Sequence, residues 1–133
     1  MIVTYLDASA VVKLMRAEAQ TATLERYLTA PRVLVSSRML EIELSCVAHR
    51  QGLPLALARG MATSIMLLPL DERTIELAQT AFHPPQRTLD AIHLATALQL
   101  GDDLDVMVSY DVDQADAARR HGIAVEHPGA IVT

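Results

Sequence analysis

The sequence predicts a three-layer α/β/α fold in which helices cover both faces of a mainly parallel central sheet. Short apolar segments rich in β-forming residues alternate with segments of helical periodicity. Such alternation is typical of α/β proteins, whose parallel strands are buried on both faces. Of the residues, 51% are hydrophobic but only 3% are aromatic. The core must therefore consist mainly of Leu, Val, Ile, Ala and Met, a composition that suits helices packed around a sheet.

Caps and helix-breaking residues set the predicted elements of the first half. Pro31 ends the second helix, because proline removes a backbone donor. Ser36 and Ser37 cap the third helix, which Gly52 closes, and Pro54 suits the first turn of the fourth. The predicted elements are, in order, a strand at 2–6, a helix that begins after it, a helix at 19–29, a strand at 33–35, a helix at 37–50, a helix from residue 54 and a strand at 65–70.

The second half continues the alternation of helices and strands. Asp71 caps a fifth helix, and the consecutive prolines at 84–85 end it. Thr88 caps a sixth helix that Gly101 closes, and Gly122 ends the seventh. No repeat, low-complexity tract or linker divides the chain, so we expect a single domain over residues 1–133. The predicted elements are a helix at 72–82, a helix at 89–100, a strand at 106–110, a helix at 113–121 and a strand at 123–125.

Composition and charge exclude several classes of protein. No apolar run approaches the roughly 20 residues that span a bilayer, and the N-terminus lacks the features of a signal peptide, so we expect a cytoplasmic protein without membrane contact. Cys46 has no partner for an internal disulfide, and its place in a helical pattern predicts a small buried hydrophobe. The net charge of −5 argues against nucleic-acid binding by a broadly basic surface. Any such contact must be local, metal-assisted or shared with a second subunit.

Two acidic residues directly follow predicted strands. Asp7 comes after the first strand, and Asp111 comes after the strand that contains Met-Val-Ser-Tyr. Because ligands bind outside the carboxyl ends of parallel strands, we expect both side chains at the same edge of the sheet. Each residue taken alone is also explained by an ordinary helix N-cap.

Glu43 lies within an otherwise apolar face of its helix. At about 100° per residue, Glu43 falls inside the apolar arc, whereas Glu41 points roughly the opposite way, toward solvent. A carboxylate on a buried face is costly unless it is paired, hydrogen-bonded or bound to a cation. The alternative to a catalytic or metal-binding role is a structural ion pair with an arginine such as Arg50. The apolar arc consists of Met39, Leu40, Cys46 and Val47.

Asp90 lies on a helix that is apolar nearly all round, which indicates a central, buried helix. It shares a stripe with Leu94 and Ala97. Its place in the first turn favours its negative charge through the helix dipole and the free backbone donors. The same placement also allows a purely structural role.

Acidic residues from distant parts of the chain are therefore expected at one edge of the sheet. Several carboxylates cannot share a pocket in the ionised form without a cation, because like charges raise one another's pKa. Oxygen ligands alone select a hard ion, Mg²⁺ or Mn²⁺, and phosphodiester cleavage is the chemistry that these ions serve best. The pattern predicts a metal-dependent nuclease. The predicted catalytic and metal-binding residues are Asp7, Glu43, Asp90 and Asp111.

Two serines flank these acids. Ser9 and Ser109 are expected to hydrogen-bond a carboxylate or a metal-bound water, or else to act as plain turn or capping hydroxyls.

Four segments carry a family resemblance: YLDASA at 5–10 with Lys13 downstream, SSRMLEIEL at 36–44, LDAIHLATA at 89–97, and SYD at 109–111 followed by ADAARRHG. In order and spacing they resemble the PIN-domain ribonucleases, specifically the VapC toxins of bacterial toxin–antitoxin pairs. The resemblance covers essentially the whole chain, and LDAIHLA is its most specific part. It implies a PIN fold, Mg²⁺- or Mn²⁺-dependent endoribonuclease activity on RNA, a homodimer and inhibition by a cognate VapB antitoxin.

The resemblance also assigns the acids. The family's acidic positions fall, in order, on Asp7, Glu43, Asp90 and Asp111, the residues chosen above from strand ends and helix faces. Asp113 is a further candidate to join or replace Asp111, ranked lower because it resembles the cap of the last helix.

Basic residues near these segments are candidates for RNA contact, although any one of them is also explained as solvated surface charge. Arg87 is favoured because it directly precedes the Asp90 helix. His93 lies one turn from Asp90 and is expected to be a satisfied buried histidine, or else to orient Asp90 or donate to RNA. The acidic stretch at 102–105 is interpreted as a solvated connector. The RNA-contact candidates are Lys13, Arg16, Arg38, Arg50 and Arg87.

Other functions fit less well. A phosphoacceptor receiver domain, with Asp71 as acceptor, needs a lysine after its last strand, whereas Lys13 is the only lysine. A haloacid-dehalogenase-type phosphatase needs an acid where this chain has Ser9. A catalytically silent PIN-fold module that acts through a protein partner stays open. The apolar surface around 11–15 and 53–66 leads us to expect a groove there for an amphipathic antitoxin segment, with an arginine reaching the acids.

Overall fold

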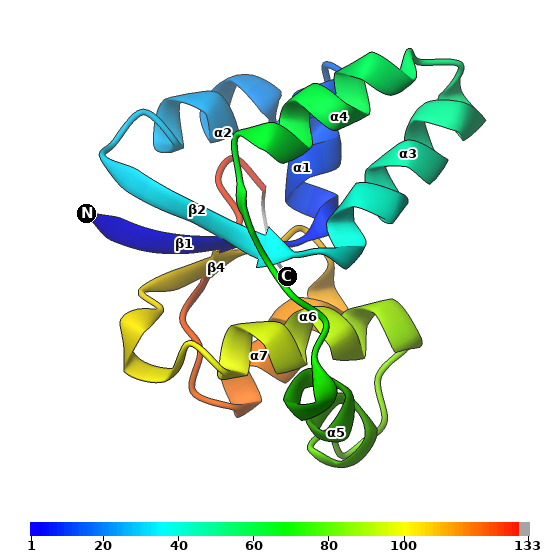
Figure 1. Ribbon diagram of the computed structural model, residues 1–133. Helices are drawn as coiled ribbons and strands as arrows, with labels where there is room; N and C mark the ends of the chain where they lie inside the picture. The colour runs from blue at the N-terminus through cyan, green and yellow to red at the C-terminus, as the bar shows by residue number, and fades with distance from the viewer. Residues whose placement is uncertain (131–133) are drawn as a thin grey trace.

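The computed structural model describes residues 1–130, which form alternating strands and helices as the sequence predicts (Figure 1). The strands are β1 (Ile2–Leu6), β2 (Arg32–Ser37), β3 (Met66–Leu68), β4 (Val106–Val108) and β5 (Val125–Glu126). The helices are α1 (Ala8–Met15), α2 (Thr21–Tyr27), α3 (Met39–Gln51), α4 (Leu55–Thr63), α5 (Glu72–Thr80), α6 (Thr88–Leu98) and α7 (Val112–Arg120), with a 3-10 turn η1 (Gly101–Asp103).

The sheet is parallel throughout, with strand order β3-β2-β1-β4-β5. Helices α1 to α4 cover one face, and α5 to α7 cover the other (Figure 1). Successive residues of a strand point to opposite faces, so Tyr5 belongs to the core under α6 and α7, whereas Leu6 belongs to the core under α1 and α3. The predicted three-layer α/β/α class is confirmed.

This topology places the carboxyl ends of β1 and β4 side by side. Leu6 at the end of β1 pairs with Val108 at the end of β4. Asp7 caps α1 directly after β1, and Asp111 caps α7 shortly after β4. The two acids predicted at strand ends therefore lie at the same edge of the sheet.

Several predicted boundaries differ from the structure. The strands β3 and β4 are shorter than predicted, and Ser36 and Ser37 belong to β2, although Ser37 Oγ still accepts a 3.1 Å hydrogen bond from the Met39 backbone at the start of α3. Arg87, rather than Thr88, occupies the N-cap position of α6. The N-cap of α7 is Asp111, because its side chain accepts from the first backbone N–H groups of the helix.

Of two predictions about the surroundings of residues, one is wrong and one is confirmed. Cys46 is exposed, because the buried stripe of α3 follows a four-residue spacing through Leu40, Leu44 and Ala48, which leaves Cys46 on the outer side. The acidic stretch at 102–105 is a solvated connector, as predicted, with its aspartates exposed; in addition, Asp105 Oδ2 accepts a 2.8 Å hydrogen bond from the backbone of Val3.

Over residues 1–130, none of the helices is both long and apolar enough to cross a membrane.

Candidate active site

A pocket of about 410 Å³ opens at the carboxyl edge of the sheet. The predicted acids line it together, although they come from segments more than a hundred residues apart in the chain. Asp7 follows β1, Glu43 projects from α3, Asp90 lies in the first turn of α6 and Asp111 caps α7. The convergence expected from strand ends and helix faces is present in the fold.

Asp7 is the most enclosed of these carboxylates, with 3% of the residue exposed. Ser9 Oγ donates to its Oδ1 at 2.6 Å, the Ala10 backbone donates to the same oxygen at 3.1 Å, and the Ser109 hydroxyl donates to Oδ2. Burial raises the pKa of Asp7, and the bonds from Ser109 and Ser9 oppose that rise. The carboxylate is fixed in orientation, and its negative charge is costly unless a cation offsets it.

The two predicted serines also connect the corners that carry the acids. The Tyr110 backbone N–H donates to Ser9 Oγ at 2.8 Å, and the Asp111 backbone N–H donates to Ser109 Oγ at 3.2 Å. Each hydroxyl therefore donates to Asp7 and accepts from the segment after β4. The serines hydrogen-bond a carboxylate, as one of their two predicted roles required.

Arg87 bridges two of the acids. Its Nε lies 3.3 Å from Asp90 Oδ2, and its Nη2 lies 3.3 Å from Asp111 Oδ2. Burial, and then the charge of Asp111, raise the pKa of Asp90, while the guanidinium of Arg87 lowers it. The Arg87 side chain is itself 76% exposed, so it contacts the acids from the solvent side of the pocket.

Glu43 is bonded to His93 and not to the arginine considered as its structural partner. Its Oε1 lies 2.6 Å from His93 Nε2, and the Glu43 side chain is 12% exposed. His93 is 2% exposed, and its Nδ1 lies 2.7 Å from the hydroxyl of Tyr5. His93 is the satisfied buried histidine that the sequence predicted, but it contacts Glu43 rather than Asp90.

The donor set of the pocket fits a hard divalent cation. Its clustered carboxylates supply oxygen, and burial of Asp7 and Asp90 leaves negative charge that a cation would neutralise. Within residues 1–130, no three His, Cys, Asp or Glu side chains are already arranged to hold a metal ion. Arg87 supplies the positive charge between Asp90 and Asp111.

The remaining predicted residues lie around this pocket or away from it. Asp113 is exposed and lines a neighbouring hollow with Asp116 and Arg120. Lys13 is not among the residues that line the acidic pocket: its Nζ lies 3.2 Å from Glu18 Oε2 and 4.7 Å from the centre of the Tyr110 ring.

The predicted arginines are dispersed. Arg16 donates to Gln51 at 3.3 Å, and Arg38 pairs with Glu41 at 3.3 Å. Arg50 lies on the outer side of α3. Among the described residues, Arg87 is the one RNA-contact candidate that lines the acidic pocket.

Gln114 is a pocket residue that the sequence reasoning missed. It is 1% exposed, it lines the acidic pocket, and its Oε1 has no hydrogen-bond partner among residues 1–130. The available signal was its position three residues after Asp111, on the face of α7 that also carries the buried Ala115 and Ala118.

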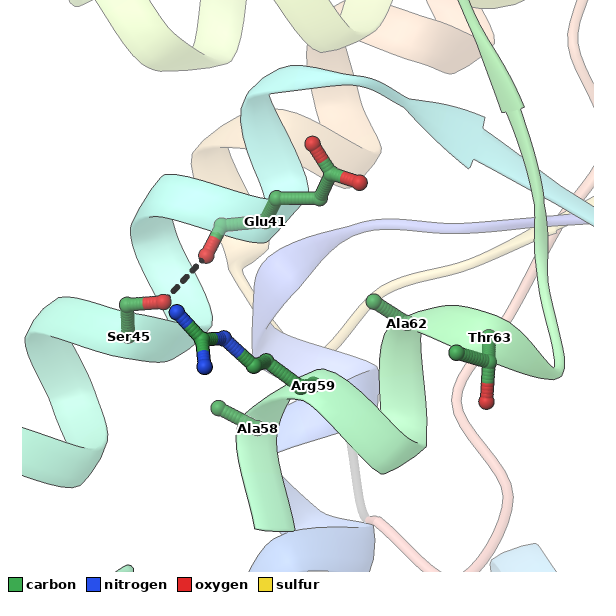
Figure 2. A pocket seen from close by; sticks show the side chains of 6 residues that line it. All are labelled: Glu41, Ser45, Ala58, Arg59, Ala62 and Thr63. Carbon is green, nitrogen blue, oxygen red and sulfur yellow. Dashed lines mark hydrogen bonds between the residues drawn. The ribbon is translucent and has the colours of Figure 1, made fainter. Parts of the chain in front are cut away.

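A second pocket, of about 450 Å³, lies between α3 and α4. Figure 2 shows Arg59 extending from α4 toward Ser45 on α3, with the small side chains of Ala58 and Ala62 also on α4. One wall of this pocket belongs to the segment 53–66, where a groove was expected, the other wall belongs to α3, and the segment 11–15 contributes no lining residue. Arg59 is a residue of this chain that the sequence reasoning did not single out; the expected arginine that reaches the acids was one of the antitoxin, and it stays a prediction.

Comparisons with known proteins agree with this geometry. The family model described as "PIN domain" matches residues 4–120. The chain is 40% identical over 125 residues to "Ribonuclease VapC46" of Mycobacterium tuberculosis, which covers 93% of this chain and 96% of the relative. It is 36% identical over 133 residues to "Ribonuclease VapC47" of the same species, covering 96% of this chain and 98% of the relative.

Solved structures share the fold. The crystal structure of Mycobacterium tuberculosis VapC20, described as a sarcin-ricin loop cleaving toxin, superimposes with a TM-score of 0.68 at 18% identity, covering 86% of this chain and 94% of that one. A toxin–antitoxin complex from Klebsiella pneumoniae gives a TM-score of 0.66 at 14% identity, covering 97% and 96%.

Proposed function

This chain belongs to the PIN-domain family, among the VapC ribonucleases, and is an RNA-cleaving toxin of a toxin–antitoxin system; we propose that its cleavage depends on Mg²⁺ or Mn²⁺ held in the acidic pocket. The observation that carries the proposal is the convergence of Asp7, Glu43, Asp90 and Asp111 on one pocket from separate elements. When bound, such an ion neutralises charge on the scissile phosphate and makes water a better nucleophile.

Neighbouring side chains of the protein orient the acidic residues for binding such an ion. Asp7 is locked by Ser9 and Ser109, so it keeps one orientation without rearrangement. Asp90 and Asp111 face the same guanidinium, which shows that one cationic group reaches both. We assign the metal ligands to these three carboxylates and Glu43, with Asp113 as an exposed neighbour beside the pocket.

Arg87 is the residue that we assign to the RNA phosphate. A divalent ion held by the acidic pocket would neutralise the charge of Asp90 and Asp111 that now holds the guanidinium. Because 76% of the Arg87 side chain is exposed, it is then able to turn toward a phosphate, which a guanidinium binds with two parallel hydrogen bonds. A local contact of this kind is consistent with a protein whose net charge is −5.

A cognate VapB-type antitoxin is the proposed protein partner. Proteins of the same fold have been solved as a toxin–antitoxin complex from Klebsiella pneumoniae and as VapBC2 from Rickettsia felis bound to promoter DNA. The pocket between α3 and α4 is the proposed docking place, because small side chains there admit a helix or strand and Arg59 offers a charge to an acidic segment (Figure 2).

Assembly and location follow from the same proposal. We expect a homodimer in solution, and large apolar side chains such as Ile42, 58% exposed, are available for burial on the outer side of α3. Light scattering coupled to size exclusion measures the dimer directly. Because its substrate is RNA, we expect the protein to act in the cytoplasm.

The deciding experiment is cleavage of structured RNAs by purified protein free of antitoxin. Wild type should cleave in Mg²⁺ or Mn²⁺ and stop when EDTA is added, and Asp7→Asn and Asp90→Asn should lose the activity. Asp102→Asn is a matched control, because Asp102 is an exposed carboxylate in η1. Identical fragment patterns from wild type and both pocket variants would contradict the proposal and favour the catalytically silent alternative.

A further inference from the structure

A buried chain of hydrogen bonds connects the central sheet to Glu43. The Tyr5 hydroxyl lies 2.7 Å from His93 Nδ1, and His93 Nε2 lies 2.6 Å from Glu43 Oε1. Tyr5 is 0% exposed and His93 is 2% exposed. These residues belong to β1, α6 and α3, so the hydrogen bonds join three elements at the rim of the acidic pocket.

The chemistry of the three groups determines which atom donates and which accepts in each of these hydrogen bonds. An ionised carboxylate only accepts hydrogen bonds, so His93 Nε2 must carry the proton that it shares with Glu43. In a neutral imidazole the other nitrogen is then an acceptor, and the Tyr5 hydroxyl donates to it. Burial raises the pKa of Tyr5 well above its ordinary value, so the hydroxyl retains its proton. Glu43 therefore sets the tautomer of His93, and Tyr5 satisfies the remaining ring nitrogen by donating to Nδ1.

We propose that His93, anchored at Nδ1 by Tyr5, is the positioning residue that presents the Glu43 carboxylate to the divalent ion. The inference rests on the proposed function, since it concerns a ligand of that same pocket. With Oε1 bonded to His93, Oε2 is the oxygen that Glu43 would offer to the ion.

Glu43 needs such a partner more than Asp7 and Asp111 do. Asp7 and Asp111 accept hydrogen bonds from backbone N–H groups at helix starts, whereas Glu43 lies in the middle of α3, where the backbone donors are used within the helix. A glutamate also has more rotatable bonds than an aspartate, and holding it in one rotamer costs conformational entropy. A buried imidazole anchored at both nitrogens holds the carboxylate before the ion arrives.

The test compares His93→Leu, which removes the donor, with His93→Gln, whose amide nitrogen is able to donate from nearly the position of Nε2. Mn²⁺ affinity is measured by calorimetry without RNA, and kcat and KM are measured with RNA. Loss of the His93 donor to Glu43 should weaken Mn²⁺ binding and lower kcat, each about 10- to 100-fold, with KM nearly unchanged. His93→Gln should restore most of the Mn²⁺ affinity and most of kcat. A role in packing alone predicts no such rescue of Mn²⁺ affinity.

The protonation of the two His93 ring nitrogens, measured by NMR, checks the direction of these hydrogen bonds. In wild type, ¹⁵N NMR of the His93 ring should show a protonated Nε2 and an unprotonated Nδ1. Tyr5→Phe removes the donor to Nδ1, so it should shift the Nδ1 signal and weaken Mn²⁺ binding, though less than His93→Leu does. If His93→Leu does not fold, Tyr5→Phe and His93→Gln carry the same comparison.

Matched controls separate failure of this inference from failure of the proposed function. His121→Gln alters another histidine bonded through both ring nitrogens, to Ala117 and Ala81, away from the acidic pocket, and should leave Mn²⁺ affinity unchanged. If Glu43→Gln weakens Mn²⁺ binding while His93→Leu and Tyr5→Phe bind as wild type does, the positioning role is wrong and the proposed function stands. If Glu43→Gln also binds Mn²⁺ and cleaves as wild type does, both are wrong.

Discussion

Ser9 and Asp7 form a short bond at the end of β1: the Ser9 hydroxyl donates to Asp7 Oδ1 at 2.6 Å and accepts from the Tyr110 backbone N–H at 2.8 Å. The same hydroxyl thus orients a carboxylate of the pocket and connects the segments that follow β1 and β4. Ser109 makes the matching pair of bonds, donating to Asp7 Oδ2 and accepting from the Asp111 backbone N–H.

Replacing Ser9 by alanine should therefore reduce both stability and cleavage. The Tyr110 N–H loses its acceptor, which costs about 1–3 kcal/mol when the group is buried, and Asp7 loses an orienting donor, which lowers activity about tenfold. Urea unfolding and RNA cleavage measure the two effects. Ser64→Ala is the control, because that exposed hydroxyl donates to Met61 O, in the helix it follows. Wild-type activity in Ser9→Ala would contradict the orienting role.

Removing the guanidinium of Arg87 tests its assignment to the RNA phosphate. Arg87→Met should raise KM for RNA about tenfold, a loss of about 1.4 kcal/mol, with a smaller effect on kcat, and should make binding less sensitive to salt. Arg87→Lys should recover only part of the effect, since a lysine ammonium is a point charge without the planar fork. An Arg87→Met enzyme with unchanged KM and salt dependence would place the phosphate contact elsewhere.

The carboxylate of Asp71 gives a prediction for stability against pH. Hydrogen bonds from the Thr74 backbone and side chain lower the pKa of Asp71 below its ordinary value. A group with a lowered folded-state pKa stabilises the protein above its unfolded-state pKa, and loses that effect as the pH falls through its folded-state pKa. Asp71→Ala should therefore lower Tm at pH 7, and the difference from wild type should shrink in strong acid. Asp71→Asn keeps a capping oxygen and should lie between them. A difference that stays constant down to pH 2 contradicts this account.

The helix that carries Asp90 and His93 depends on its buried face. Leu94 is 0% exposed in the core between α6 and the sheet, so Leu94→Ala should reduce the free energy of unfolding by about 2–5 kcal/mol. Ile75 on α5 is 44% exposed, and Ile75→Ala should change it by no more than about 0.5 kcal/mol. Chemical denaturation compares the two; similar losses in both would mean that α6 is not anchored as described.

Much of this site was predictable because simple geometric rules place its residues. Strand ends in a parallel sheet share one edge, which brought Asp7 and Asp111 together, and the period of the α-helix separated Glu43 from Glu41. In the structure the Glu43 side chain is 12% exposed, whereas that of Glu41 is 46% exposed. These rules need only local pattern and topology.

The rest depends on packing between elements, which no local pattern encodes. The partner of Glu43 is His93 because α3 and α6 meet at the end of the sheet, and Arg87 reaches Asp111 because α6 and α7 begin side by side. The burial of Cys46 was wrongly predicted because the apolar arc of α3 is wider than the stripe that the neighbouring elements cover.

The most direct test of the metal-site claim is anomalous diffraction from crystals of the wild-type protein soaked in Mn²⁺, with Asp7→Asn crystals treated in the same way. The account predicts a strong peak among the carboxylates of Asp7, Glu43, Asp90 and Asp111, with Arg87 displaced from Asp90 and Asp111, and a weak or absent peak in the variant. A peak elsewhere, or none in the wild type while Arg87 still bridges Asp90 and Asp111, would contradict it.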